Sequence, residues 1–310
     1  MEVTQHEAFD APAATIIILT KNGGRYLDEA LAAIRAQATA HRFEILLIDS
    51  GSVDGTLQIA TSHGIQAHQI APASFNHGAT RNLGGRLAHP ASRFLVFLTQ
   101  DATPLPGWLD NLIAPLEADP CIAGAFSRHV PRADCNPILA RQMREDWEQC
   151  GTPERVVKRI EDTADYERRK IHYVYFANTS SCIRRSVWEQ YPFPTTDFAE
   201  DAQWAEKVLS AGYTLLYEPA SQVLHSHSFP LLEHSRRNRQ HARAMRALQP
   251  GGDVPPEAGS PAIHLVSTMW RDWRSLWQDP EHDCWWKMRW SIYSPLWHGA
   301  AGVGSWLGGR

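Results

Sequence analysis

Three short apolar runs restrict the fold of this chain more than any other feature. They are "TIIILT" (15–20), "FEILLID" (43–49) and "RFLVFLT" (93–99), and a helix-like pattern follows each of them. Such runs are typical of strands that are buried on both faces of a sheet. Strands that alternate with helices predict right-handed βαβ units. We therefore expect an α/β fold with a mostly parallel central sheet flanked by helices.

Polar turn segments follow the three predicted strands: "TKNGG", "DSGSVDG" and "TQDATP". Ligands of such sheets bind beyond the carboxyl ends of the strands, so these segments are expected to line a site. The third segment carries a lone acid, Asp101. Its carboxylate could cap the following helix, or it could bind a hard divalent cation such as Mg²⁺ or Mn²⁺.

Three further segments carry candidate chemistry, and each has a plainer structural alternative. Glu200 and Asp201 in "FAEDAQW" open a helix, where they either complement the helix dipole or supply a general base. His225 and His227 in "VLHSHS" share one face of a strand, so they either bind a metal or face solvent. Arg81 in "FNHGATRNLG" offers a planar fork suited to a nucleobase or a phosphate, or it lies on the surface.

The C-terminal part of the chain is rich in tryptophan. Eight of the twelve tryptophans follow residue 269, and Trp270, Trp273 and Trp277 have helical spacing. With the basic segment 234–248, they could form an element that contacts a membrane surface. Alternatively, the tryptophans pack a helical extension onto the rest of the protein or form a homodimer contact.

Overall composition and charge argue against several classes of protein. A net charge of −4 gives no reason to expect a nucleic-acid partner. The five cysteines include no CxxC pair, which argues against a disulfide framework or a zinc ribbon and fits a reducing compartment. The first residues are polar and acidic, unlike a signal peptide, and no apolar run approaches the roughly 18 residues of a membrane span. We expect a cytoplasmic protein, free or attached at the inner face of the membrane.

Five motifs in order closely resemble a family 2 inverting glycosyltransferase of the GT-A fold, in its rhamnosyltransferase-like branch. They are "TIIILTKNGGRYLDEALAAI", "IDSGSVDGT", "FNHGATRNLG", "FLTQDATPLPGWL" and "FAEDAQWAEKVLSAGYTLLYEPASQVLHSH". The resemblance implies an N-terminal tail (1–13), a GT-A domain (14–232) and a helical, Trp-rich C-terminal extension (233–310).

The resemblance also implies roles for particular residues. The nucleotide-sugar site would be formed by Thr20, Asn22, Asp49, Ser50, Arg81, Gln100 and Asp101. Many relatives have a second Asp where this chain has Ser50. The family's metal motif has two acids flanking one residue and here reads Thr99-Gln100-Asp101, which leaves Asp101 as the carboxylate ligand. His225 and His227 match the family's C-terminal histidine near the metal, and Asp201, beside Glu200, matches the catalytic base.

The implied activity is inverting transfer of a sugar in polysaccharide biosynthesis, assisted by a divalent metal (Mg²⁺ or Mn²⁺). The rhamnosyltransferase-like branch points to L-rhamnose from dTDP-rhamnose, transferred to a saccharide or a lipid-linked saccharide. One alternative is a sugar nucleotidylyltransferase, although "TKNGGRYL" matches the expected glycine-rich phosphate loop poorly. Another is a non-catalytic carbohydrate-binding protein, which would have little need of Asp101, Asp201 and His225 together.

Overall fold

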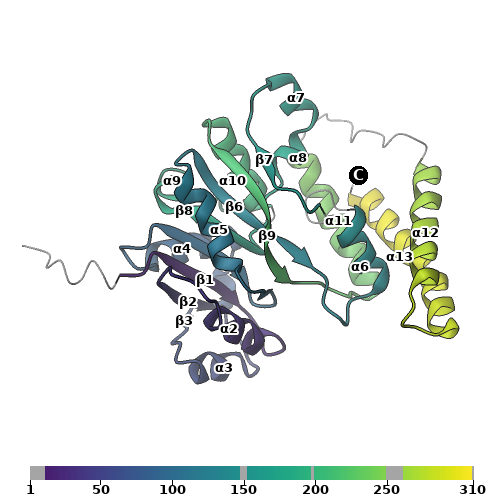
Figure 1. The fold of residues 1–310 in the computed structure, drawn as a ribbon, viewed down its shortest axis with the longest axis horizontal. Helices are drawn as coiled ribbons and strands as arrows, with labels where there is room; N and C mark the ends of the chain where they lie inside the picture. Colours follow the sequence, from purple (N-terminus) through teal and green to yellow (C-terminus); the bar gives the residue numbers. More distant parts are fainter. Residues whose placement is uncertain (1–10, 147–151, 197–198, 249–260, 309–310) are drawn as a thin grey trace, which may run out of the picture. The chain divides into compact units, whose positions relative to one another are not determined.

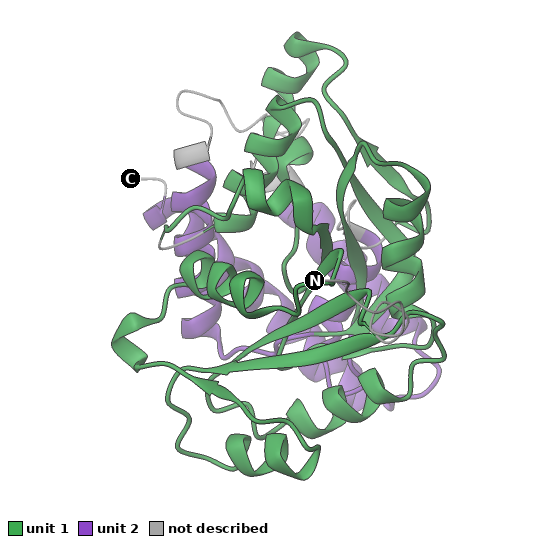
Figure 2. Ribbon diagram, turned by 90° about the vertical axis from the view of Figure 1, so that its left-hand side faces the viewer, with its two compact units in different colours: residues 1–130, 149–225 green, residues 131–148, 226–310 purple. Residues whose placement is uncertain are grey.

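The computed structural model describes residues 11–146, 152–196, 199–248 and 261–308 (Figure 1). The chain divides into two compact units (Figure 2). The first unit comprises residues 1–130 and 149–225, and the second comprises residues 131–148 and 226–310. The domain boundaries expected at 13/14 and 232/233 stay predictions. The C-terminal part of the second unit begins at residue 226, slightly before the expected boundary. The second unit also includes residues 131–148 from the middle of the chain.

A nine-stranded sheet forms the centre of the first unit, in the order β3-β2-β1-β4-β8-β6-β9-β5, with β7 paired to β9. Its strands are β1 (Ala14–Thr20), β2 (Phe43–Asp49), β3 (His68–Gln69), β4 (Phe94–Thr99), β5 (Thr103–Pro104), β6 (Ile122–Val130), β7 (Val156–Lys158), β8 (Ser180–Arg184) and β9 (Thr214–Leu224).

The three apolar runs form adjacent strands of this sheet. β1 lies between β2 and β4, and both pairs are parallel, as is the pair of β2 with β3. The predicted α/β architecture is confirmed. The other half of the sheet is mixed, because β8 is antiparallel to both β4 and β6 while β6 and β9 are parallel.

Helices cover the sheet and exclude water from its strands. Ile16, Ile17 and Ile18 of β1 are fully buried, so side chains on both faces of the strand are covered. The helices and turns of the first unit are α2 (Leu27–Arg35), α3 (Thr56–Ser62), the 3₁₀ turn η1 (Pro72–Ser74), α4 (His77–Leu87), α5 (Trp108–Ala118), α7 (Thr163–Arg168), α8 (Lys170–Val174), α9 (Arg185–Gln190) and α10 (Glu200–Ser210).

The second unit is helical, as expected for the C-terminal extension. Its elements are α6 (Pro137–Arg141), the π-helical turn η2 (Gln142–Asp146), α11 (Leu231–Leu248), α12 (Pro261–Gln278) and α13 (Cys284–Gly308). The segment "PGGDVPPEAGSP" (250–261), whose composition predicts a flexible break, lies outside the described residues except for Pro261, where α12 begins. Among the described helices, none combines the length and apolar character needed to span a bilayer.

A buried polar cluster ties three helices of this unit together. Asp272 of α12 is 1% exposed and accepts hydrogen bonds from Arg141 Nε (2.6 Å) and Ser294 Oγ (2.6 Å). Its Oδ2 atom is also 2.7 Å from Nε2 of His298. Because a buried carboxylate is stable only when its lone pairs are satisfied, these partners from α6 and α13 hold α12 in place.

Candidate functional site

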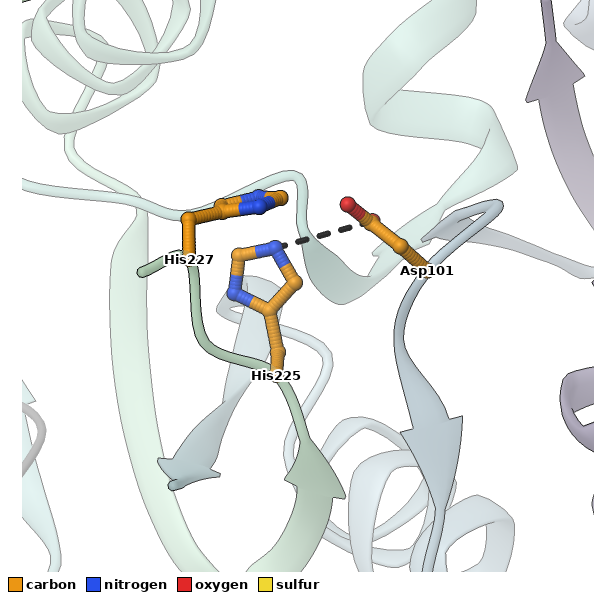
Figure 3. Close-up of side chains that lie close together, drawn as sticks. All are labelled: Asp101, His225 and His227. Carbon is orange, nitrogen blue, oxygen red and sulfur yellow. Dashed lines mark ion pairs between the residues drawn. The ribbon is translucent and has the colours of Figure 1, made fainter. Parts of the chain in front are cut away.

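The pairing of β5 with β9 explains why two residues far apart in the sequence meet. Thr103 pairs with Leu224 in antiparallel register. Asp101 therefore lies at the same end of this strand pair as His225. The backbone N–H of His225 donates to the carbonyl of Val130 (3.0 Å), and its Nε2 atom lies 3.6 Å from Oδ1 of Asp101 (Figure 3).

His227 completes a group of three possible metal ligands. It is separated from His225 by a single residue, so the chain itself keeps it nearby. Asp101, His225 and His227 each offer one ligand atom, and these atoms all lie within 4.8 Å of one another (Figure 3). Two ligands about 2.1 Å from one ion are at most about 4.2 Å apart, so small side-chain movements suffice to hold an ion. Two imidazole nitrogens favour a transition metal such as Mn²⁺ over Mg²⁺, which prefers oxygen ligands.

A third histidine, His129, packs against this group. His129 of β6 is 6% exposed, and its ring packs edge-on against that of His225 with centroids 5.3 Å apart. Burial, with a smaller contribution from the charge of His225, lowers the pKa of His129 to about 3. The ring is therefore neutral near pH 7. His129 was not identified from the sequence, where the only signal is a polar residue within the buried strand "AFSRHV".

Two adjacent carboxylates open α10, and their surroundings differ. Glu200 is 6% exposed and forms an ion pair with Nη1 of Arg81 in α4. Asp201 is partly buried and accepts hydrogen bonds from the backbone N–H groups of Ala202 (2.8 Å) and Asn178 (3.5 Å). Burial raises the pKa of Asp201 to about 6, and the negative charge of Glu200 adds to the increase. Asp201 is thus a stronger base than an ordinary carboxylate and remains largely deprotonated near pH 7.

Backbone hydrogen bonds bring Asp201 to the edge of the sheet that carries Asp101. The N–H of Thr99, at the carboxyl end of β4, donates to the carbonyl of Thr179 (3.0 Å). Asn178 precedes Thr179 and donates its own N–H to Asp201. Both carboxylates therefore lie at the carboxyl end of β4, where α/β sheets bind ligands.

Asn178 lies in "YFANTSSCIRR" (175–185), whose small and polar residues predict a segment that lines the donor or acceptor pocket, although the sequence does not single out Asn178 itself. Asn178 is 1% exposed, and its Oδ1 accepts a hydrogen bond from Ser181 Oγ (2.8 Å). Within the described residues, its Nδ2 atom has no hydrogen-bond partner. A buried amide donor without a partner is costly, so a ligand or water at this position would satisfy it.

The ends of β1 and β2 form a rigid turn around Asp49. Its Oδ2 accepts a hydrogen bond from Thr20 Oγ1 (3.0 Å), and its Oδ1 accepts from the N–H groups of Gly51 and Ser52 (both 2.9 Å). Burial alone would raise the pKa of Asp49, but the hydrogen bonds from Ser52, Thr20 and Gly51 lower it below its usual value. Ser50 is also buried and donates through Oγ to the carbonyl of Thr20 (3.1 Å).

The neighbouring "KNGG" turn is held by two side-chain amides. Asn22 has a left-handed backbone (φ 51°), and its Oδ1 accepts a hydrogen bond from the N–H of Val53 (2.9 Å). Gln100 accepts from the N–H of Lys21 (2.8 Å) and donates to the carbonyl of the same residue (3.1 Å). The side chain of Gln100 thus forms with Lys21 the two hydrogen bonds that the backbone of a neighbouring strand would form, and it links the ends of β1 and β4. A Cβ atom at Gly23 would lie 2.5 Å from Gln100 Oε1, so glycine permits this approach.

The structure thus places the predicted nucleotide-site residues in two groups. Thr20, Asn22, Asp49, Ser50, Gln100 and Asp101 follow or end the strands β1, β2 and β4, whereas Arg81 forms its ion pair with Glu200. Nucleotide binding by these residues, metal binding by the Asp101 group and catalysis by Asp201 stay predictions.

Sequence comparisons point to one family. The model of "Glycosyl transferase family 2" matches residues 15–191. The O-antigen chain rhamnosyltransferase RfbN of Salmonella typhimurium is 34% identical over 226 residues, which cover 72% of this chain and 69% of that protein. The O-antigen chain rhamnosyltransferase WbaN of Salmonella anatum is 33% identical over 222 residues, covering 70% of this chain and 67% of that protein. The resemblance indicated by the five motifs is confirmed.

Solved structures show the same fold. The mannosyltransferase PcManGT from Pyrobaculum calidifontis, in complex with GDP-Man and Mn²⁺, has a TM-score of 0.55 at 18% identity, covering 95% of this chain and 87% of that one. Residues 1–349 of S. aureus TarS, in complex with UDP-GlcNAc, have a TM-score of 0.53 at 14% identity, covering 94% of this chain and 80% of that one. At these identities the likeness establishes the fold, which confirms the predicted GT-A architecture.

Proposed function

This chain belongs to glycosyltransferase family 2, and we propose that it is an inverting, metal-assisted rhamnosyltransferase that uses dTDP-L-rhamnose. The donor sugar is suggested by the two O-antigen chain rhamnosyltransferases, which are 33% and 34% identical to this chain. By the same similarity, the acceptor is a saccharide or lipid-linked saccharide in the synthesis of a surface polysaccharide.

The placement of Asp201 at the carboxyl end of β4, beside Asp101 and with a raised pKa, is the observation that carries the proposal. A carboxylate with a pKa of about 6 is well matched to accept a proton from an acceptor hydroxyl near neutral pH. As the proton moves to Asp201, the acceptor oxygen forms a bond to the anomeric carbon of the donor. The bond from that carbon to the diphosphate oxygen breaks at the same time, so the displacement inverts the anomeric configuration. Nucleoside diphosphate is the leaving group.

On the donor side, Asp101, His225 and His227 would hold the divalent cation. A bound cation neutralises the charge that develops on the diphosphate leaving group. Thr20, Asn22, Asp49, Ser50 and Gln100 are proposed to position the nucleotide at the ends of β1, β2 and β4. Their hydrogen bonds to one another and to the backbone of Lys21 and Val53 keep this edge rigid, which limits the entropy lost when a donor binds. Arg81 is also proposed to contact the nucleotide, with a guanidinium group that pairs with Glu200 through Nη1.

The proposal is tested by incubating the purified protein with dTDP-L-rhamnose, Mn²⁺ and a panel of saccharide acceptors. We expect release of dTDP, a product heavier by one deoxyhexose, and an inverted anomeric configuration by NMR. Asp201→Asn should lower turnover by about 10²–10⁴. Glu206→Gln, which changes another acid of α10 that pairs with Lys170, is the matched control and should retain activity.

Three results would contradict the proposal in different ways. Release of pyrophosphate in place of dTDP would indicate a nucleotidylyltransferase. Saccharide binding without any transfer would indicate a carbohydrate-binding protein. Unchanged turnover in Asp201→Asn would remove Asp201 as the base.

A further inference from the structure

Helix α13 is apolar on two opposite faces, and only one of them is buried. Its inner face packs on α11, where a Cβ atom at Gly304 would lie only 2.1 Å from the carbonyl oxygen of Ser235. The opposite face exposes large apolar side chains spaced three, four or seven residues apart, each between 41% and 72% exposed: Trp285, Met288, Ile292, Leu296, Val303 and Trp306. A helix that is hydrophobic all round normally has both faces covered.

Helix α12 carries a second apolar stripe of the same kind. Val266, Trp270, Trp273 and Trp277 follow one side of the helix and are 42–65% exposed. The indole rings of Trp270 and Trp273 stack with centroids 5.2 Å apart, and those of Trp273 and Trp277 are 5.8 Å apart. The other side of α12 buries Thr268, Asp272 and Leu276.

The two stripes meet at one end of the helix pair. Nε1 of Trp277 donates a hydrogen bond to Oγ of Ser291 (3.2 Å), the residue before Ile292. We call the ten residues of the two stripes the aromatic surface. An exposed apolar patch of this extent commonly marks a contact with a membrane or another protein.

The charged residues of α12 and α13 distinguish a membrane partner from a protein partner. The sequences of α12 and α13 contain a single acid, Asp272, which is buried among Arg141, Ser294 and His298. The cations Arg271, Arg274, Lys287 and Arg289 lie on the same helices. The other acids of this region are in the connecting turn (279–283), beyond the helix ends. The charged side chains that these helices expose beside the aromatic surface are therefore positive.

We propose that the aromatic surface docks onto an anionic membrane, with α12 and α13 lying in the plane of the interface. Helices with Trp and Leu on one face and Lys or Arg around it bind bilayers in this way, with the apolar face between the headgroups. Indole rings suit that position because they combine an apolar ring with a polar N–H. Anionic headgroups supply the negative charge that the exposed surfaces of the two helices lack.

A second copy of the chain fits this surface less well. A two-fold contact would place the same patch on both partners. Arg274, Lys287 and Arg289 of each copy would then surround one interface, and the helices themselves offer no exposed acid to pair with them. In the connecting turn, Asp279 already pairs with His282, and Asp283 accepts a hydrogen bond from the N–H of Trp286. The membrane contact does not depend on which sugar is transferred, or on whether transfer occurs.

Sedimentation of the full chain with vesicles tests the inference. We expect binding to phosphatidylcholine vesicles that contain a quarter phosphatidylglycerol, weaker binding to phosphatidylcholine alone, and a blue shift of tryptophan emission on binding. Ile292→Glu removes an apolar contact and adds negative charge, so binding should fall by about tenfold or more. Arg289→Gln should weaken binding to the anionic vesicles by about fivefold.

Val157→Glu is the matched control. Val157 is 61% exposed, close to the 68% of Ile292, but it lies on β7 in the first unit. This variant should bind vesicles as the unmodified protein does, and circular dichroism should show that both variants are folded. The inference is overturned if the unmodified protein does not sediment with anionic vesicles, or if Ile292→Glu binds as well as Val157→Glu. A dimer in light scattering that Ile292→Glu converts to monomer, without vesicle binding, would assign the surface to a second copy.

Discussion

Arg81 and Glu200 form an ion pair in which less than a tenth of either side chain is exposed, next to the proposed base Asp201. The pair joins α4 to the start of α10 across 119 residues of sequence. Glu200 raises the pKa of Asp201 by repulsion, whereas Arg81 lowers it by attraction. The basicity of Asp201 therefore depends on both partners.

Glu200→Gln should lower the pKa of Asp201, because the neutral amide no longer repels the ionised carboxylate. The acid limb of the pH profile of kcat/KM for rhamnosyl transfer should move to lower pH. A weaker base should also reduce kcat on the plateau, since proton acceptance follows the pKa of the base. The matched control, Glu206→Gln, should leave the limb in place. An acid limb unchanged by Glu200→Gln would show that it does not report Asp201.

Asp201→Asn should stabilise the protein near neutral pH while it removes activity. The folded state raises the pKa of Asp201 from 3.8 to about 6, so keeping this group ionised costs folding free energy. The cost is absent below about pH 4 and develops as pH rises through about 6. Urea unfolding should show a gain of about 1–3 kcal/mol at neutral pH. The gain should vanish in mild acid. If the variant is instead less stable than the unmodified protein at neutral pH, the ionised carboxylate of Asp201 does not cost folding free energy, which would contradict the raised pKa.

Local features of the sequence were enough to predict the first half of the fold. The runs at 15–20, 43–49 and 93–99 are mostly apolar because helices cover both faces of the sheet, so their pattern alone indicates buried parallel strands. The turn residues Asn76, His77 and Gly78 predict a helix from about Ala79. The helix begins two residues earlier, at His77, because the side chain of Asn76 accepts a hydrogen bond from the N–H of Ala79.

The contacts that shape the candidate site depend on long-range pairing, which no local pattern contains. Asp101 and His225 meet because Thr103 pairs with Leu224, and nothing near either residue indicates that register. The partner of Arg81 could not be predicted either, since Glu200 follows far along the chain. Helical spacing revealed the tryptophan stripe of α12. It did not show that this stripe is exposed, because buried and exposed apolar faces have the same period.

Removal of either Asp101 or His225 as a ligand should weaken metal binding without unfolding the protein, since both side chains are partly exposed. We expect Asp101→Asn and His225→Gln each to reduce Mn²⁺ affinity by at least about tenfold, measured by electron paramagnetic resonance without nucleotide. His68→Gln, which changes an exposed histidine of β3, is the control. Equal Mn²⁺ affinity in all three variants would rule out this group as the metal site.

Asp272→Asn should strongly destabilise the helical unit. The carboxylate of Asp272 is fully buried and balances the guanidinium of Arg141, of which 1% is exposed. Removing one partner of a buried pair leaves the other charge uncompensated, and the typical loss is about 3–5 kcal/mol. Asp279→Asn, in the turn between α12 and α13, changes a more exposed acid and should cost less than about 1 kcal/mol.

The pH dependence of this loss provides a second test of the same cluster. Burial alone would raise the pKa of Asp272, but hydrogen bonds from His298, Ser294 and Arg141 lower it below its value in the unfolded chain. A carboxylate with a lowered pKa contributes stability above its unfolded pKa, about 3.9, and loses that contribution as pH falls through the folded value. The difference between Asp272→Asn and the unmodified protein in urea unfolding should therefore be full at neutral pH and shrink below about pH 4. A difference independent of pH would mean that the variant acts through packing, with no contribution from the buried charge.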